Sequence, residues 1–149
     1  MGYIEDNLSV GEKVVYRANV SAAVLIITVI FFAFIIWLSS KVSTMMVTLM
    51  TILTIIVILR VLIAMFTTEI ALTDRRIIGK RGVLQQHSIE MLLKKVESIS
   101  VKRTLLGLIF GYGTVTIIGS GGTKESFPSI DKPMEFRKRV NDQIAEQNW

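Results

Sequence analysis

The 149-residue chain has no cysteine and one histidine, His87. The lack of cysteine excludes disulfide frameworks, cysteine-ligated zinc and thiol catalysis. A single histidine excludes a two-histidine metal site and a histidine relay, and we expect His87 to lie at the surface or rim of a strand. Gly119–Thr123 lacks the Gly-Lys-Ser/Thr ending of a phosphate-binding loop. The carboxylates are scattered among bases, so the sequence predicts no catalytic residue, no metal site, no cofactor and no enzymatic activity.

Long uncharged apolar sequence is abundant near the start of the chain. Val20–Leu38 and Val42–Leu59 contain no charged residue, and only Ser39-Ser40-Lys41 separates them. About eighteen or more apolar residues in a helix cross the roughly 30 Å hydrocarbon core of a bilayer. The sequence therefore predicts a transmembrane helical hairpin over residues 20–66.

Basic residues flanking the hairpin indicate its orientation. Lys13 and Arg17 precede it and Arg60 closes the second span, whereas the connecting loop carries only Lys41. Because positive flanks face the cytoplasm, we expect a two-pass protein of the cell inner membrane with both termini cytoplasmic. Arg60 is either a functional charge within the membrane or an interface anchor whose side chain reaches the headgroups, and we favour the anchor.

After the hairpin the hydrophobic period changes from helical to two, which is typical of strands. Six strands are predicted, over Thr67–Thr73, Arg76–Arg81, Val83–Met91, Lys95–Arg103, Tyr112–Gly119 and Thr123–Phe127. The apolar segment Leu105–Gly111 interrupts them, and it is either buried under the sheet or pressed against lipid.

Both ends of the chain complete this domain. Residues 1–19 contain a seventh strand, Glu12–Arg17, so the hairpin is inserted between neighbouring strands of one sheet. Residues 67–149 end in an amphipathic helix over 131–147, with Asp131 as its N-cap and Pro133 in its first turn. Seven short antiparallel strands bury one face only by closing a β-sandwich or partly open barrel. The fold class is thus an α+β membrane protein whose cytoplasmic domain is capped by this helix.

Four motifs in this order resemble a known family. They are Gly11–Arg17 before the hairpin, Thr68–Ile78 directly after it, Leu106–Val115, and Gly119–Thr123. Together they resemble the membrane-anchored bacterial pleckstrin-homology-like (PH) proteins of the bacterial PH domain 2 kind. The resemblance implies two roughly orthogonal sheets closed at one end by the C-terminal helix, and it implies no catalytic activity.

Basic side chains are the candidate recognition chemistry of the domain. Residues 67–149 hold 13 Lys or Arg and 9 Asp or Glu, a net charge of +4. The candidates for binding a headgroup or a partner are Arg75, Arg76, Lys80, Arg81, Lys94, Lys95, Lys102 and Arg103. The alternative is an ordinary solvated face. We expect no nucleic-acid partner, because aromatic stacking residues do not interleave with these bases.

Three functions remain open. The first is a membrane-tethered interaction module that binds another membrane protein or forms a homo-oligomer. The second is the binding of anionic lipid or phosphate headgroups by the basic surface. The third is an accessory subunit of a transporter or membrane enzyme. Membrane lipid is an expected partner in each case, and no small-molecule substrate is expected.

Overall fold

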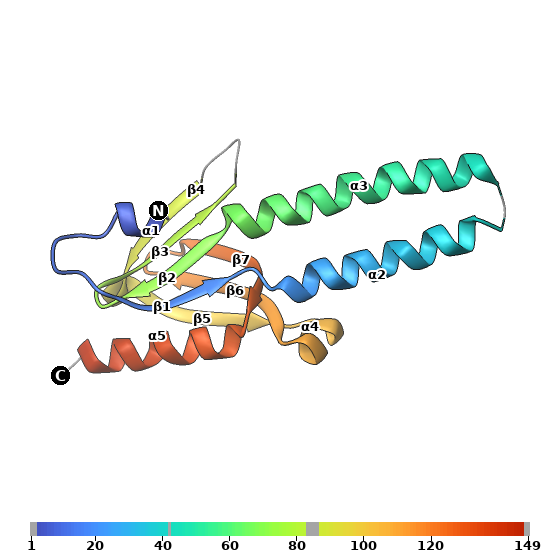
Figure 1. Ribbon diagram of the computed structural model, residues 1–149. Helices are drawn as coiled ribbons and strands as arrows, with labels where there is room; N and C mark the ends of the chain where they lie inside the picture. The colour runs from blue at the N-terminus through green and yellow to red at the C-terminus, as the bar shows by residue number, and fades with distance from the viewer. Residues whose placement is uncertain (1–2, 42, 83–86, 148–149) are drawn as a thin grey trace.

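The computed structural model describes residues 3–41, 43–82 and 87–147 (Figure 1). Two long helices, α2 (Ala22–Ser39) and α3 (Thr44–Thr67), form an antiparallel hairpin that projects from a β-rich domain. Val42, where the second span was predicted to start, and residues 83–86, where the third predicted strand starts, lie outside the described residues.

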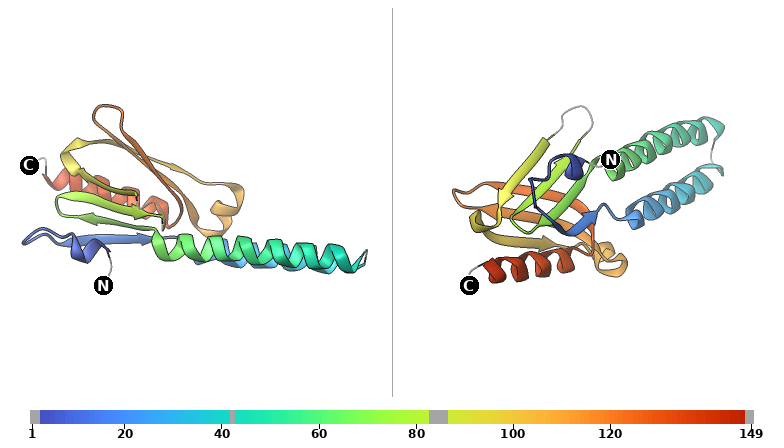
Figure 2. Two further views of the ribbon diagram at one scale, coloured as in Figure 1. Left: turned by 90° about the horizontal axis from the view of Figure 1, so that it is seen from above. Right: turned by 60° about the vertical axis from the view of Figure 1, so that its left-hand side comes forward.

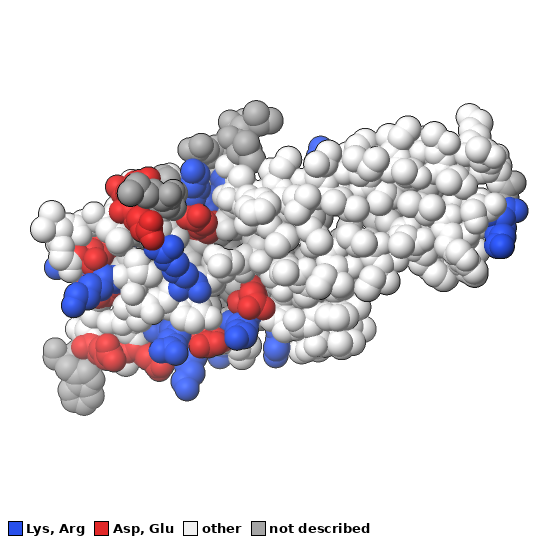
Figure 3. Space-filling view, viewed as in Figure 1, with Lys and Arg blue, Asp and Glu red and all other residues white. Residues whose placement is uncertain are grey.

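The hairpin has the length and the surface of a membrane-spanning pair. At about 1.5 Å per residue, the 18 residues of α2 extend about 27 Å and the 24 residues of α3 about 36 Å. Both helices are long and apolar enough to cross a membrane, and their large apolar side chains are exposed. Figure 3 shows charged side chains over the strands and the last helix, α5 (Pro133–Gln147), and few on the hairpin before its tip. By length and composition, α2 and α3 are therefore candidate membrane spans.

Seven strands in the described residues form two antiparallel sheets. The first has the order β1-β2-β3-β4 and the second the order β5-β6-β7. Their strands cross in Figure 2. The remaining elements are β1 (Val14–Asn19), β2 (Glu69–Thr73), β3 (Arg76–Arg81), β4 (His87–Leu92), β5 (Val96–Lys102), β6 (Tyr112–Gly119), β7 (Lys124–Asp131), α1 (Tyr3–Asp6), the 3-10 turn Leu93–Lys95, α4 (Leu105–Phe110) and α5 (Pro133–Gln147).

The hairpin is inserted between two neighbouring strands, as predicted. β1 and β2 pair antiparallel, with Asn19 opposite Glu69 at the end next to the membrane helices. Two residues connect β1 to α2, and Thr68 alone connects α3 to β2. The Ser21 amide also donates to the Ser129 carbonyl of β7 at 2.7 Å. The hairpin base is thus fastened to both sheets.

One hydrophobic core lies between the two sheets and α5. Ile70 of β2, Ile117 of β6 and Phe136 of α5 are fully buried in it. The ring of Phe127 lies against Gly79 of β3, where an added Cβ would come within 2.4 Å of the ring. The face of α5 with Phe136, predicted to cover the sheet, therefore closes the sandwich.

The start of α5 differs from the prediction. Asp131 is the last residue of β7 and not the helix N-cap, which was a wrong prediction. The Lys132 carbonyl accepts the first helical hydrogen bonds, from the amides of Glu135 and Phe136 at 3.0 and 3.2 Å. The helix begins at Pro133. An N–H at the first helical position has no partner within the helix, so its absence in proline costs no hydrogen bond.

A buried ion pair links the chain before the hairpin to the chain after it. It lies at the end of β1 and β2 that is far from the membrane helices. The Glu12 carboxylate accepts from Arg76 Nε at 3.0 Å and from Nη2 at 2.8 Å. It also accepts from the Thr73 hydroxyl at 2.6 Å and the Ser9 amide at 2.8 Å. Arg76 contacts Glu90 of β4 as well. The segment before β1 is thereby fixed to β2, β3 and β4.

This ion pair changes the acidity of Glu12. Hydrogen bonding from Arg76 lowers the pKa of the Glu12 carboxyl from 4.5 to about 2, although burial opposes the shift. A carboxyl with a depressed pKa in the folded state stabilises the fold above its unfolded pKa, and this stabilisation is lost as the pH falls towards the folded pKa. Each pKa unit is worth about 1.4 kcal/mol, so the contribution above pH 4.5 is roughly 3 kcal/mol.

We predict that Glu12→Gln lowers the free energy of unfolding of the full chain in nanodiscs by roughly 3 kcal/mol at pH 7. The difference from the wild type is expected to shrink as the pH falls from about 4.5 to about 2, because wild-type Glu12 then becomes protonated and neutral. Denaturant unfolding followed by circular dichroism at several pH values measures this. A difference that stays constant over this range contradicts the prediction.

Candidate functional site

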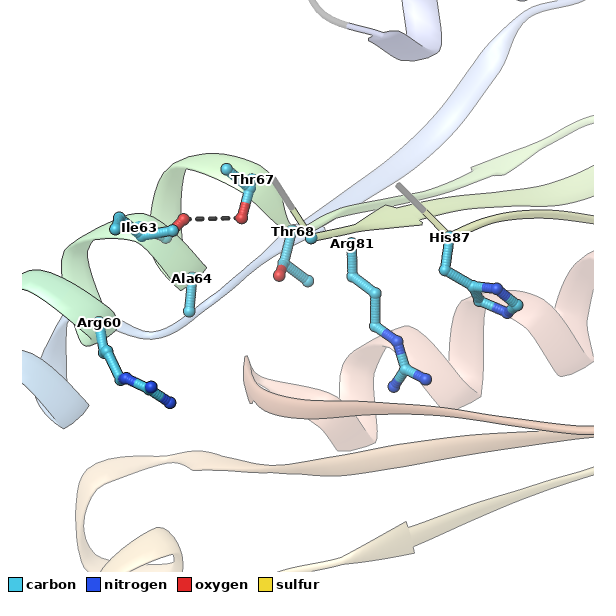
Figure 4. A pocket seen from close by; sticks show the side chains of 8 residues that line it. Arg60, Ile63, Ala64, Thr67, Thr68, Arg81 and His87 are labelled. Carbon is cyan, nitrogen blue, oxygen red and sulfur yellow. Dashed lines mark hydrogen bonds between the residues drawn. The ribbon is translucent and has the colours of Figure 1, made fainter. Parts of the chain in front are cut away.

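An open hollow of about 660 Å³ lies where α3 meets the domain (Figure 4). Its walls come from the last two turns of α3 and from the facing ends of β3 and β4. Arg60, Arg81 and His87 supply its basic side chains. The other lining residues are Ile63, Ala64, Thr67, Thr68 and Gly82.

Helical spacing brings the α3 residues of this hollow to one face. Arg60, Ile63, Ala64 and Thr67 follow positions i, i+3, i+4 and i+7, which lie along one side of a helix. The Thr67 hydroxyl donates to the Ile63 carbonyl at 2.7 Å, so it is satisfied within the helix. Arg60 is exposed. Its guanidinium is therefore available to a ligand on this side of α3.

Strand pairing brings Arg81 and His87 to the same place. They lie opposite each other in the β3–β4 ladder, at the end next to α3. Arg81 is half-buried and donates to the Ser126 carbonyl at 2.5 Å, which fixes its direction. His87 is exposed, as predicted, and its Nε2 lies 3.2 Å from both Glu125 carboxylate oxygens. In Figure 4 Arg60 and Arg81 project to the same side of the α3–β2 junction.

A second, apolar hollow of about 240 Å³ adjoins the first at Arg60, Ala64 and Thr68. It lies between the bases of α2 and α3 and is closed by β7. Its remaining lining residues are Val20, Val24, Val57, Val61, Pro128 and Ser129. A cationic hollow next to an apolar one matches the two parts of an anionic amphiphile.

The predicted basic candidates do not lie together in the structure. Arg75, Lys94 and Lys95 lie at the end of the domain far from the membrane helices, where the Leu93 amide donates to the Arg75 carbonyl. Arg76 is held by Glu12 and Glu90.

The remaining four candidates lie nearer the membrane helices. Lys80 lies opposite Glu69 in the β2–β3 ladder, and Arg81 lines the hollow. Lys102, the last residue of β5, and Arg103, which follows it, are exposed and lie between β5 and α4. The candidates therefore do not form one patch. From the sequence alone, Arg60 was not predicted to contribute to the hollow. The spacing of seven residues between Arg60 and Thr67, which places both on one face of a helix, was visible in the sequence.

Among the described residues, no three His, Cys, Asp or Glu side chains lie together in a way that could hold a metal ion. Arg60 and Arg81 offer this site positive charge and hydrogen-bond donors through their guanidinium groups. These groups match phosphate or carboxylate oxygens.

Comparison with known proteins gives one family and one relative. A family described as "Bacterial PH domain" matches residues 14–144. The UPF0699 transmembrane protein YdbT of Bacillus subtilis (strain 168) is 26% identical over 76 residues. That match covers 48% of this chain and 15% of the relative, so the chain corresponds to a small part of that protein. No solved structure matches.

Proposed function

The chain belongs to the bacterial PH domain family, and on this premise we propose that it binds the anionic headgroup of a membrane lipid in the hollow at the α3–β3 junction. The lipid comes from the leaflet next to the domain. Arg60 and Arg81 are the residues that contact its phosphate. Its acyl chain occupies the neighbouring apolar hollow between α2 and α3.

The position of Arg60 along α3, and therefore its depth in the bilayer, is the main support for this proposal. Arg60 lies seven residues before the end of α3, or about 10 Å along the helix axis. A long basic side chain at this depth reaches the headgroup region while its stem stays in the hydrocarbon. Each base near an anionic surface adds about 1 kcal/mol of attraction. The hollow thus presents its charge where lipid phosphates are found.

The proposal also covers the activity of the protein and its orientation in the membrane. We propose that the protein is not an enzyme and that the domain and both termini lie on the cytoplasmic face of the inner membrane. α1 and α5, the first and last described helices, both lie at the end of the hairpin opposite its tip, and basic residues concentrate there, which supports this orientation. The relative's description as a transmembrane protein agrees with the membrane location.

We predict that Arg60→Gln weakens the preference of the full chain for anionic over zwitterionic lipid by roughly fivefold, the equivalent of about 1 kcal/mol. Spin-labelled lipids added to nanodiscs that contain the protein measure this preference as the fraction of immobilised label. The substitution removes the charge and keeps a polar residue that favours helix at an exposed position, so the fold of α3 is preserved.

Arg75→Gln is the matched control, because Arg75 is exposed and lies at the far end of the domain. It is expected to leave the lipid preference unchanged. Equal immobilisation of anionic and zwitterionic lipid by the wild-type protein contradicts the proposal. So does an equal loss of preference in the Arg60 and Arg75 variants.

A second candidate function is the binding of another membrane protein or of a second copy of the chain along β4. β4 is one of the two edge strands of the first sheet, and Ser88, Glu90 and Leu92 on it are exposed. Edge strands accept a further strand through their backbone groups. This observation supports the interaction-module hypothesis independently of the hollow.

We predict that a photo-crosslinking amino acid in place of Ser88 captures a protein in native membranes, whereas the same amino acid in place of Asn141 does not. Both positions are exposed, but Asn141 lies on α5 and not at a strand edge. Differently tagged copies of the chain distinguish self-association from another partner. The absence of adducts at both positions argues against a partner on β4.

A further inference from the structure

The short helix α4 exposes apolar side chains to the outside of the domain. Its sequence, Leu-Leu-Gly-Leu-Ile-Phe, contains no polar side chain. Leu105 is 81% and Ile109 is 75% exposed, and Leu106, Leu108 and Phe110 are exposed as well. The alternative that this segment is buried under the sheet is therefore wrong. A helix that is apolar on all sides is normally covered by protein or lipid, and the described residues do not cover α4.

The position of α4 indicates what covers it. In Figures 1 and 2, α4 lies beyond the ends of β5 and β6, on the side towards which the hairpin projects, and beside the first turns of α2. α2 is uncharged from Ala22 to Ser39, so its first turns enter the hydrocarbon. In Figure 3 the uncharged surface of the hairpin continues onto this region. α4 is thus at the depth where the bilayer begins.

The backbone of α4 suits an environment without water, where unsatisfied polar groups are costly. The Thr104 hydroxyl accepts from the Gly107 amide at 3.1 Å and its carbonyl from the Leu108 amide at 2.8 Å. Gly111, in the left-handed conformation, donates to the Gly107 carbonyl and accepts from the Lys132 amide, both at 3.0 Å. A Cβ on Gly107 would lie 2.4 Å from the Tyr112 carbonyl oxygen, so the helix folds tightly back onto β6.

Basic residues flank α4 where headgroups would lie. Lys102 and Arg103 come just before its N-cap Thr104, Lys132 is hydrogen-bonded to its C-cap, and all three are exposed. Bases next to an apolar insertion reach the phosphate layer while the apolar side chains enter the acyl region.

We propose that α4 inserts its apolar side chains into the same leaflet that α2 and α3 enter, as a third point of contact with the membrane. A contact with the leaflet away from the hairpin axis opposes any tilt of the domain that would lift α4 out of the lipid. A protein partner fits less well, because a standard protein interface uses about 20–30 residues on each side and α4 has six. This proposal does not depend on lipid binding in the hollow at Arg60.

The absence of cysteine from the chain allows a direct test. Two variants of the full chain are made, one with Ile109→Cys and one with Leu105→Cys. Each is labelled with an environment-sensitive fluorophore and placed in nanodiscs that contain one copy of the protein. Ser120→Cys, at the exposed β6–β7 turn, is the matched control. Quenching is measured with iodide in the water and with lipids brominated along their acyl chains.

The α4 labels are expected to show blue-shifted emission, quenching by brominated lipid and protection from iodide, whereas the Ser120 label shows the opposite. Quenching of the α4 labels by iodide but not by brominated lipid overturns the proposal. Protection from both quenchers also overturns it, since α4 is then covered by protein. Unchanged circular dichroism in the three variants shows that the labels report on the native fold.

Discussion

The ion pair between Glu12 and Arg76 is the contact on which the arrangement of the domain and the hairpin depends. Glu12 precedes the first membrane helix, and Arg76 follows the second. Their two hydrogen bonds, at 3.0 and 2.8 Å, close the ladder of β1 and β2 at the end opposite the hairpin. With one end of β1 fixed by this pair and the other by the Ser21–Ser129 bond, the hairpin base keeps its position under both sheets.

The sequence predicted the hairpin and most strands, because uncharged length and a period of two are local signals. The end of β7 was missed for a tertiary reason. Pro128 and Ser129, the latter with a φ of 58°, are typical of a chain break, yet β7 continues through them. Contacts with the base of the hairpin hold this stretch, since Ile130 forms a bridge with Val20. Nothing in the local sequence predicts that contact.

The candidate site was only partly predictable, for the same reason. The sequence identifies which residues are basic, but their neighbours are distant in the chain. Arg76 and Arg75 are adjacent in sequence, yet Arg76 contacts carboxylates of Glu12 and Glu90 while Arg75 is 61% exposed. Arg60 and Arg81 line one hollow because β2 and β3 return the chain to the end of α3. Only the strand register supplies that information.

The short connections at the base of the hairpin have a mechanical consequence. Val20 and Ser21 on one side, and Thr68 on the other, leave no slack between the membrane helices and the strands. A helix pair responds to a thinner or thicker bilayer by changing its tilt. In this chain such a tilt turns β1 and β2 together with the membrane helices. The angle of the domain to the membrane surface therefore follows the tilt of the hairpin.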